Sequence, residues 1–119
     1  MIAHVILFAP KADLSDGTRE ELLSGLAAAA ASIPSIRRFR VGARVTHGLP
    51  GYEQLMREPY AFAVIIEFDD VAGLKAYLEH PAHKGLGAHF TTSASHSLAY
   101  DYELIEIPTG RQEPGRSLR

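Results

Sequence analysis

Tyr77, His80 and His83 form the densest group of side chains capable of chemistry, within the segment Tyr77-Leu-Glu-His80-Pro-Ala-His83. Imidazole titrates near neutral pH and suits general acid–base catalysis, and a tyrosine hydroxyl can donate a hydrogen bond to a developing oxyanion. His83 follows a helix break, in a loop setting where reactive side chains are common. His80 directly precedes a proline, which predicts that it caps the next helix. Tyr77 also fits a purely structural role, as an aromatic ring half packed on a sheet.

His4 places a titratable side chain inside the apolar run Ile2–Phe8. On such a strand a single histidine is more often a hydrogen-bonded core residue than a catalyst. Three further histidines, His47, His89 and His96, lie in or near predicted loops and are interpreted as surface residues. His4 and the histidine at position 83 are therefore the two whose positions need an explanation.

No metal or cofactor site is predicted. His80 and His83 have the i, i+3 spacing that could present two imidazoles to a metal ion, but the intervening proline interrupts the helix and no carboxylate is placed as a third ligand. The chain has no cysteine, which excludes disulfides, thiolate metal sites and cysteine nucleophiles. It also contains no glycine-rich phosphate loop, nucleophile elbow or zincin motif.

The overall composition is that of one ordinary globular domain. The 119 residues include 12 Lys and Arg against 14 Asp and Glu, and the resulting formal charge of −2 excludes a generally basic nucleic-acid or membrane-surface binder. No stretch approaches the roughly 20 apolar residues that span a bilayer, and the N-terminal segment lacks the basic start of a secretion signal. We expect a cytoplasmic protein with one domain at residues 1–107 and a flexible C-terminal tail at residues 108–119, which is polar and contains proline and glycine.

Hydrophobic patterning predicts four strands and two main helices. The predicted strands span residues 2–8, 37–45, 60–68 and 97–107. The first helix ends before a proline, the second begins after Asp69 and Asp70, and a short glycine-broken helix follows in residues 81–92. The expected inward stripes are Leu22, Leu26, Ala30 and Ile33 in the first helix and Val71, Leu74 and Leu78 in the second. The order β-α-β-β-α-β is the signature of an α+β ferredoxin-like fold, a four-stranded antiparallel sheet with its helices on one face.

The third strand predicts that the chain pairs with a second copy of itself. Residues 61–66, Ala-Phe-Ala-Val-Ile-Ile, are apolar at every position, as expected of a strand buried on both faces. Two helices cover only one face of such a sheet, so we expect a homodimer with sheet-to-sheet packing.

In the second strand Arg38, Arg40 and Arg44 share one face, which indicates that part of this face lies near an edge or an opening. The long connection at residues 47–59 is interpreted as a lid, a binding loop or a flexible insertion.

Four segments of the chain resemble the stress-responsive A/B barrel (Dabb) family, over roughly residues 1–107. They are His4-Val-Ile-Leu-Phe8, Ile33-Pro-Ser-Ile, the stretch from Phe68-Asp-Asp to the Tyr77-Leu-Glu-His80-Pro-Ala-His83 segment, and Tyr100-Asp-Tyr. Members of this family form dimeric α+β barrels in which the sheets of two protomers pack face to face. The resemblance therefore implies a dimeric α+β barrel, in agreement with the homodimer expected from strand burial.

The resemblance implies more than one function, because the family is diverse. Some members are similar to plant stress proteins without assigned chemistry. One branch comprises polyketide cyclases, which close a linear poly-β-keto thioester by intramolecular aldol condensation without a cofactor. The residues that line the pocket in that branch match His4, Tyr77 and His83 here. We hypothesise His83 as the base, Tyr77 as the oxyanion donor and His4 as an orienting partner.

Three classes of function are open at this point. The first is a cofactor-independent cyclase, isomerase or lyase acting on a small hydrophobic carbonyl compound. The second is a non-catalytic ligand-binding or stress-response dimer, and the third is a cofactor-free monooxygenase of the structurally related dimeric type. A cavity lined by His4, Tyr77 and His83 would favour the enzyme, whereas a filled core with these side chains bonded to the backbone would favour the second class. The two histidines on opposite faces of the sheet would contradict a shared site.

Overall fold

The strands and helices follow the predicted order, with one helix longer than expected. The computed structural model describes residues 1–11 and 16–110, and for residues 18, 19 and 88–93 the backbone only. The elements are β1 (Ile2–Pro10), α1 (Asp16–Ser32), β2 (Arg38–Ala43), β3 (Phe62–Phe68), α2 (Val71–Glu79), α3 (Pro81–Ser93) and β4 (Ala94–Glu103). α3 takes the place of the short helix expected in residues 81–92. Of the predicted tail, the part from residue 111 onward lies outside the described residues.

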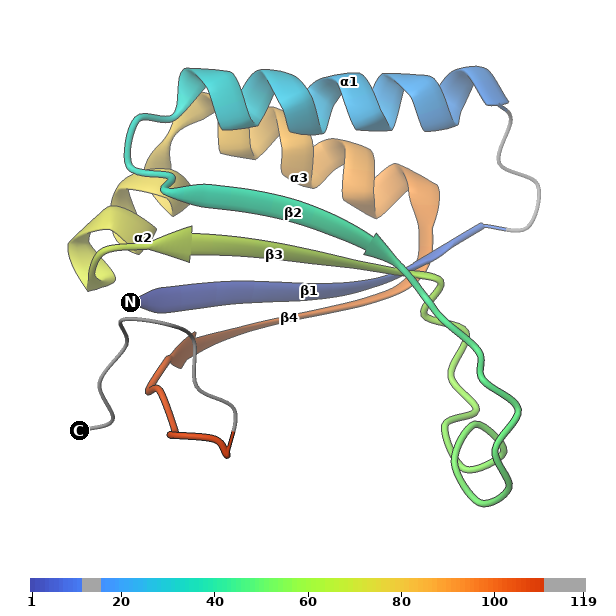
Figure 1. The fold of residues 1–119 in the computed structure, drawn as a ribbon. Helices are drawn as coiled ribbons and strands as arrows, with labels where there is room; N and C mark the ends of the chain where they lie inside the picture. Colours follow the sequence, from blue (N-terminus) through green and yellow to red (C-terminus); the bar gives the residue numbers. More distant parts are fainter. Residues whose placement is uncertain (12–15, 111–119) are drawn as a thin grey trace.

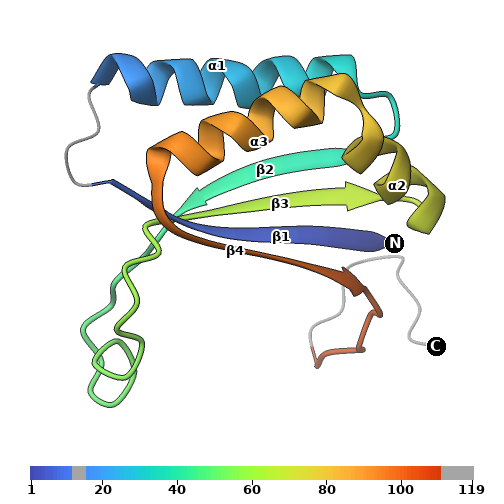
Figure 2. The same ribbon diagram turned by 180° about the vertical axis from the view of Figure 1, so that it is seen from behind.

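The four strands form one antiparallel sheet of order β2-β3-β1-β4, so β1 and β3 are central and β2 and β4 are the two edges. All three helices lie over one face of this sheet, which can be followed from opposite sides in Figure 1 and Figure 2. This arrangement is the ferredoxin-like fold that the order of elements predicts. We refer to the face under the helices as the inner face and to the other as the open face.

The hydrophobic core lies between the helices and the inner face of the sheet. Alternate residues of β1 and β3 point into it and pair directly across the strands, as Ile2 does with Phe68 and Ile6 with Val64. The buried residues from α1 and the position just after it are Leu22, Leu26, Ala29 and Ile33. Ala29 is therefore buried where the pattern placed Ala30. The period-2 strands and the 3.6-period helix thus bury facing apolar surfaces.

The inner side of α2 differs from the predicted stripe. Leu74 and Tyr77 are buried, whereas Val71 and Leu78 are exposed, so the prediction that the latter two face inward is wrong. In a helix with 3.6 residues per turn, Val71 and Leu78 lie together on one side of Leu74 and Tyr77 lies on the other. The helix turns its aromatic side to the sheet. Asp70 caps its first turn by accepting a hydrogen bond from the Gly73 N–H at 2.9 Å.

The ends of the strands depend on where their partners begin. β4 stops at Glu103 rather than at the predicted residue 107, because β1 starts at Ile2. The hydrogen bond next to this end runs from the Leu104 N–H to the Met1 carbonyl oxygen, over 2.9 Å. β2 and β3 are also shorter than predicted, and residues 44–61 connect them.

No helix formed by the described residues covers the open face of the sheet (Figure 1). Its larger apolar side chains on β1, β3 and β4 are Val5, Leu7, Ile65, Leu98, Tyr100 and Tyr102. On β2 this face carries Arg38 and Arg40, and β2 is an edge strand. The prediction that the arginine side of this strand lies near an edge is therefore confirmed. The apolar residues remain half-buried or exposed in the single chain.

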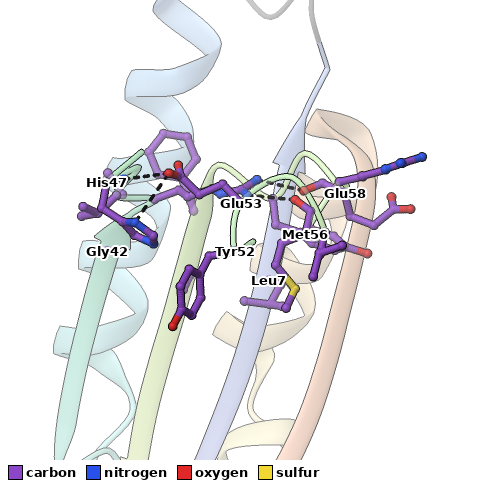
Figure 3. Close-up of a pocket in the computed structure, with 15 residues that line it drawn as sticks. Leu7, Gly42, His47, Tyr52, Glu53, Met56 and Glu58 are labelled. Carbon is purple, nitrogen blue, oxygen red and sulfur yellow. Dashed lines mark hydrogen bonds and ion pairs between the residues drawn. The ribbon is translucent and has the colours of Figure 1, made fainter. Parts of the chain in front are cut away.

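The connection 44–61 projects away from the helices, from the end of the sheet opposite to α2 (Figure 1). The Arg44 guanidinium donates hydrogen bonds to the carbonyl oxygens of Met56, at 2.9 Å, and Glu58, at 3.1 Å. The Glu53 carboxylate accepts from the backbone N–H groups of His47 and Gly48. A cavity of about 740 Å³ lies between this connection and the adjoining ends of β1, β2 and β3 (Figure 3).

Candidate active site

His4, Tyr77 and His83 lie side by side on the inner face of the sheet. The ring centroids of His4 and Tyr77 are 5.5 Å apart, and those of Tyr77 and His83 are 4.6 Å apart. β1 supplies the first residue, α2 the second and the first turn of α3 the third. The tyrosine ring lies in contact with both imidazoles. The arrangement that would contradict a shared site, with the two histidines on opposite faces, is not present.

The junction of α2 and α3 at His80 brings Tyr77 and His83 together. The backbone N–H of His80 donates to the Tyr77 carbonyl oxygen at 3.2 Å and ends α2. Its ring Nδ1 accepts from the backbone N–H of Ala82 at 3.1 Å, in the first turn of α3. The prediction that His80 caps the following helix is confirmed. Pro81 begins α3, where its missing N–H would have no helical partner.

Tyr77 is fully buried and packs against Phe68, with 5.3 Å between the ring centroids. Burial raises the pKa of Tyr77 to about 12, and the charge of Asp101 contributes in the same direction. The phenol therefore stays protonated at neutral pH. It can donate a hydrogen bond but cannot act as a base.

His83 is half-buried, and its orientation is determined by the backbone. Its Nδ1 lies 3.1 Å from the Leu78 carbonyl oxygen. A carbonyl oxygen only accepts, so Nδ1 carries the hydrogen and Nε2 of the neutral ring keeps its lone pair. Burial lowers the pKa of His83, the bond to Leu78 opposes this, and the charge of His4 lowers the pKa further. The net direction favours the neutral imidazole, which is the form that can accept a proton.

Asp101 is the residue of this site that sequence reasoning missed. It is the direct partner of His4 across β1 and β4, and its Oδ1 lies 2.5 Å from the His4 Nδ1. The carboxylate thus holds the imidazole by Nδ1 and leaves Nε2 for other contacts. The available signal was the Tyr100-Asp-Tyr sequence, which places a charged residue between two aromatic residues inside a strand. Its partner could not be identified before the register of β1 and β4 was known.

The hydrogen bonds that orient the two imidazoles therefore come from Leu78 and Asp101. His47 and His96 are exposed, as expected, and His96 Nδ1 lies 3.2 Å from the hydroxyl of Ser95. The side chain of His89 lies outside the described part of the chain. Within the described residues, no three His, Asp or Glu side chains are grouped so that they could hold a metal ion.

The connection 44–61 does not cover this site. It leaves the opposite end of the sheet and lies on the side away from the helices (Figure 1). Of the three interpretations of this segment, a lid, a binding loop or a flexible insertion, a lid over this site does not hold in the single chain. The physical reason is that this connection follows one end of β2, whereas α2 follows the other end of β3. The cavity beside the connection 44–61 brings His47, Tyr52 and Glu53 close together instead (Figure 3).

Among the described residues, no helix is long and apolar enough to cross a membrane.

Comparison with solved structures places the fold among dimeric ferredoxin-like proteins. A dimeric ferredoxin-like protein of unknown function from Thermobifida fusca YX is 26% identical, with a TM-score of 0.67 over 87% of this chain and 90% of that one. A protein from Arabidopsis thaliana is 25% identical, with a TM-score of 0.75 over 92% and 100% of the two chains. A hydroxynitrile lyase from Passiflora edulis is 13% identical, with a TM-score of 0.76 over 91% and 96%, and this likeness shows the fold alone.

The family comparison covers almost all of the described chain. Comparison with curated protein sequences finds no match. A family model described as the stress responsive A/B barrel domain matches residues 2–104, from the start of β1 to one residue beyond the end of β4. This span contains the four segments that resemble the family in sequence. The chain belongs to the stress responsive A/B barrel domain family.

Proposed function

We propose that the protein is a cofactor-independent cyclase or lyase acting on a small, polyketide-like carbonyl compound by histidine and tyrosine acid–base catalysis. The observation that carries this proposal is the contact of Tyr77 with both His4 and His83, with a carboxylate on His4. Two imidazoles beside a phenol that stays protonated are the groups that an aldol closure needs.

His83 acts as the general base in this mechanism. Its Nε2 removes a proton from a carbon between two carbonyl groups, and the resulting enolate carbon attacks a second carbonyl carbon of the same molecule. A carbon–carbon bond forms, the electron pair of that carbonyl moves to its oxygen, and the protonated His83 returns its proton to this alkoxide. The lowered pKa of His83 supports this role, because the base is neutral before the reaction.

Tyr77 and His4 stabilise and position the reacting groups. The Tyr77 hydroxyl donates to the oxygen on which negative charge develops, and its pKa of about 12 keeps it protonated throughout. His4 is held by Asp101, and this carboxylate stabilises positive charge on the ring when His4 takes up a proton. His4 and Asp101 are thus positioning residues beside the tyrosine.

An apolar cavity on the same face of the sheet supports a partly hydrophobic substrate. It measures about 100 Å³ and is lined by apolar residues of α1 and the strands, among them Phe8, Leu26 and Val64. Phe8 lies four residues beyond His4 on the same face of β1, a distance of about 13 Å along the strand. His4, Tyr77 and His83 do not line this cavity. The proposed substrate therefore extends along β1, with its apolar end near Phe8 and its carbonyl groups near His4.

The proposed active form is a homodimer in which the open faces of two sheets pack together as an α+β barrel. The apolar side chains on the open face support this, because exposed apolar surface of this kind marks an interaction site. The dimeric protein from Thermobifida fusca YX, which has the same fold, supports it as well. A cytoplasmic location stays a prediction from the sequence.

The test uses a short linear poly-β-keto thioester of N-acetylcysteamine, with the cyclised product followed by absorbance and mass spectrometry. We expect His83→Gln and Tyr77→Phe each to lower kcat, with a loss of roughly 10²–10⁴-fold for the base. The matched control is His47→Gln, which removes an exposed histidine in the connection 44–61 and leaves kcat unchanged. Absence of turnover by the unmodified dimer, or equal turnover by His83→Gln, contradicts the proposal.

A non-catalytic ligand-binding role is the second candidate, and two observations favour it. Tyr77 is fully buried, and His83 is bonded to a backbone carbonyl oxygen, as in a filled core. In this case the poly-β-keto thioester would bind, with a measurable heat by titration calorimetry, but no product would form. Tyr77→Phe would then change the melting temperature and the affinity for the thioester, and neither the variant nor the unmodified protein would form product.

A further inference from the structure

The tyrosine of the candidate site is closed off from solvent in this structure. The exposed fraction of Tyr77 is 0% and that of His4 is 6%. A hydroxyl group with no accessible surface cannot donate a hydrogen bond to a substrate, because no substrate atom reaches it. The structure therefore shows a closed form of the site, and one of the elements around Tyr77 has to move before a substrate binds.

Of the elements around Tyr77, α3 is the one that opens at the lowest cost. β1 and β3 are central strands with hydrogen bonds on both sides, so neither moves without breaking the sheet. α2 carries Tyr77 itself and is fixed at its start by the Asp70 cap. α3 supplies His83, whose ring lies against the Tyr77 ring with 4.6 Å between the centroids.

Two glycines weaken α3 directly behind His83. Gly85 and Gly87 lie in its second turn, and neither has a positive φ. A Cβ added at either position would meet no atom within 4 Å. Neither the backbone conformation nor close packing therefore requires glycine at these two positions. Their effect is on helix stability, because each glycine lowers the local helix–coil equilibrium roughly fourfold to fivefold relative to alanine.

The first turn of α3 lies between this weak point and a second one. His80, just before it, is extended, with φ −70° and ψ 139°. Residues 81–84, which include His83, are thus joined to the rest of the chain by a non-helical residue on one side and by glycine on the other. Leu86 is 3% exposed and belongs to the hydrophobic core, so its burial holds this turn in the closed position.

We propose that the first turn of α3 is the gate of the candidate site and that Gly85 and Gly87 determine how often it opens. When the turn rotates outward, His83 separates from Tyr77 and the tyrosine hydroxyl becomes accessible. When the turn returns, His83 contacts the bound substrate and water is excluded. The inference rests on the proposed function for the identity of the substrate, and it adds the element that regulates access to the site.

Hydrogen exchange of the backbone amides measures the opening of α3 directly. Gly85→Ala and Gly87→Ala should each raise the protection of the amides of residues 84–87 roughly fourfold to fivefold, and the double variant about 20-fold. Gly17→Ala is the matched control, because Gly17 is exposed in α1 and a Cβ there also meets no atom within 4 Å. This control should leave the exchange of the α3 amides unchanged.

Acetylation by N-acetylimidazole measures access to the Tyr77 hydroxyl, with the modified residue located by mass spectrometry. We expect Tyr77 to react about 20-fold more slowly in the Gly85→Ala/Gly87→Ala variant than in the unmodified protein. Tyr52 is 60% exposed and is the internal reference, whose rate stays the same. An unchanged Tyr77 rate in the double variant overturns the gate. An equal slowing by Gly17→Ala overturns it as well, because Tyr77 would then become accessible only through unfolding of the whole chain.

The thioester assay shows whether the substrate enters through this gate. A ligand that binds only the open form has its apparent affinity reduced by the fraction of molecules that are open. The KM of the Gly85→Ala/Gly87→Ala variant should therefore rise about 20-fold while kcat stays the same. An unchanged KM, or a fall in kcat alone, overturns the gate as the entrance of the substrate. If the unmodified protein does not turn the thioester over, the proposed function fails, and the acetylation rates still decide whether the gate exists.

Discussion

His4 and Asp101 face each other across β1 and β4, with 2.5 Å between Nδ1 and Oδ1. The two residues are 97 positions apart in the chain and become neighbours only through the pairing of the first and last strands. The carboxylate determines which ring nitrogen of His4 carries a hydrogen. Nε2 is then left for the site that Tyr77 shares with His83.

Replacement of Asp101 by Asn should disturb this tautomer with little change in volume. An amide can donate as well as accept, and it does not stabilise a charged imidazole as a carboxylate does. We expect kcat to fall by at least about tenfold at neutral pH, in the direction seen for carboxylate-to-amide changes beside catalytic histidines. Nitrogen NMR shifts of the His4 ring should change at the same time.

Glu103→Gln is the control for Asp101→Asn, because Glu103 lies two residues further along the same side of β4 and pairs with Ile2. It should leave both kcat and the His4 nitrogen shifts unchanged. An unaltered His4 tautomer in the Asp101→Asn variant would contradict the role assigned to Asp101.

The pH dependence of kcat/KM should reflect the lowered pKa of His83. A general base must be unprotonated, so kcat/KM is level at neutral pH and falls as the pH drops through the folded-state pKa of His83, which lies below 6.5. The measurement is a pH–rate profile from about pH 5 to pH 9. An acid limb with its midpoint above 6.5 would show that His83 is not the base.

Tyr77 should make the folded protein less stable in strongly alkaline solution. Its folded-state pKa is raised to about 12 from 10.0, so the unfolded chain loses its phenol proton first. The contribution of Tyr77 to the free energy of unfolding is fully present below pH 10. This contribution is lost as the pH rises through about 12. Tyr77→Phe keeps the ring and removes this loss, which urea unfolding at several alkaline pH values will detect. Tyr52→Phe, at an exposed position, should leave the pH dependence unaltered.

The cap of α2 should contribute measurably to stability. Asp70→Ala removes the acceptor for the Gly73 N–H and is expected to lower the free energy of unfolding by about 1 kcal/mol. Asp69→Ala at the neighbouring position breaks only an exposed ion pair with Arg37 and should have a smaller effect. Urea unfolding of both variants gives the comparison, and an equal loss for the two would contradict the capping role.

The sequence by itself determined the order of the strands and helices, because hydrophobic periodicity is a local property of each element. It also predicted the capping role of His80, which follows from a polar residue next to a proline. The roles proposed for Tyr77 and His83 come from the resemblance to the family and stay predictions. The same periodicity did not determine how α2 is rotated. Two apolar stripes were compatible with its spacing, and packing of the Tyr77 ring against Phe68 decided between them.

Only the tertiary structure decided which residues meet. The Asp101 carboxylate on His4 and the Leu78 carbonyl on His83 both depend on strand register and helix placement. A shift of one residue in a strand moves its side chains to the other face of the sheet. The alternation of residues within one strand does not determine which residue of the neighbouring strand lies opposite. Contacts between distant segments therefore had to come from the folded chain, because they are produced by packing rather than by the spacing of residues along one element.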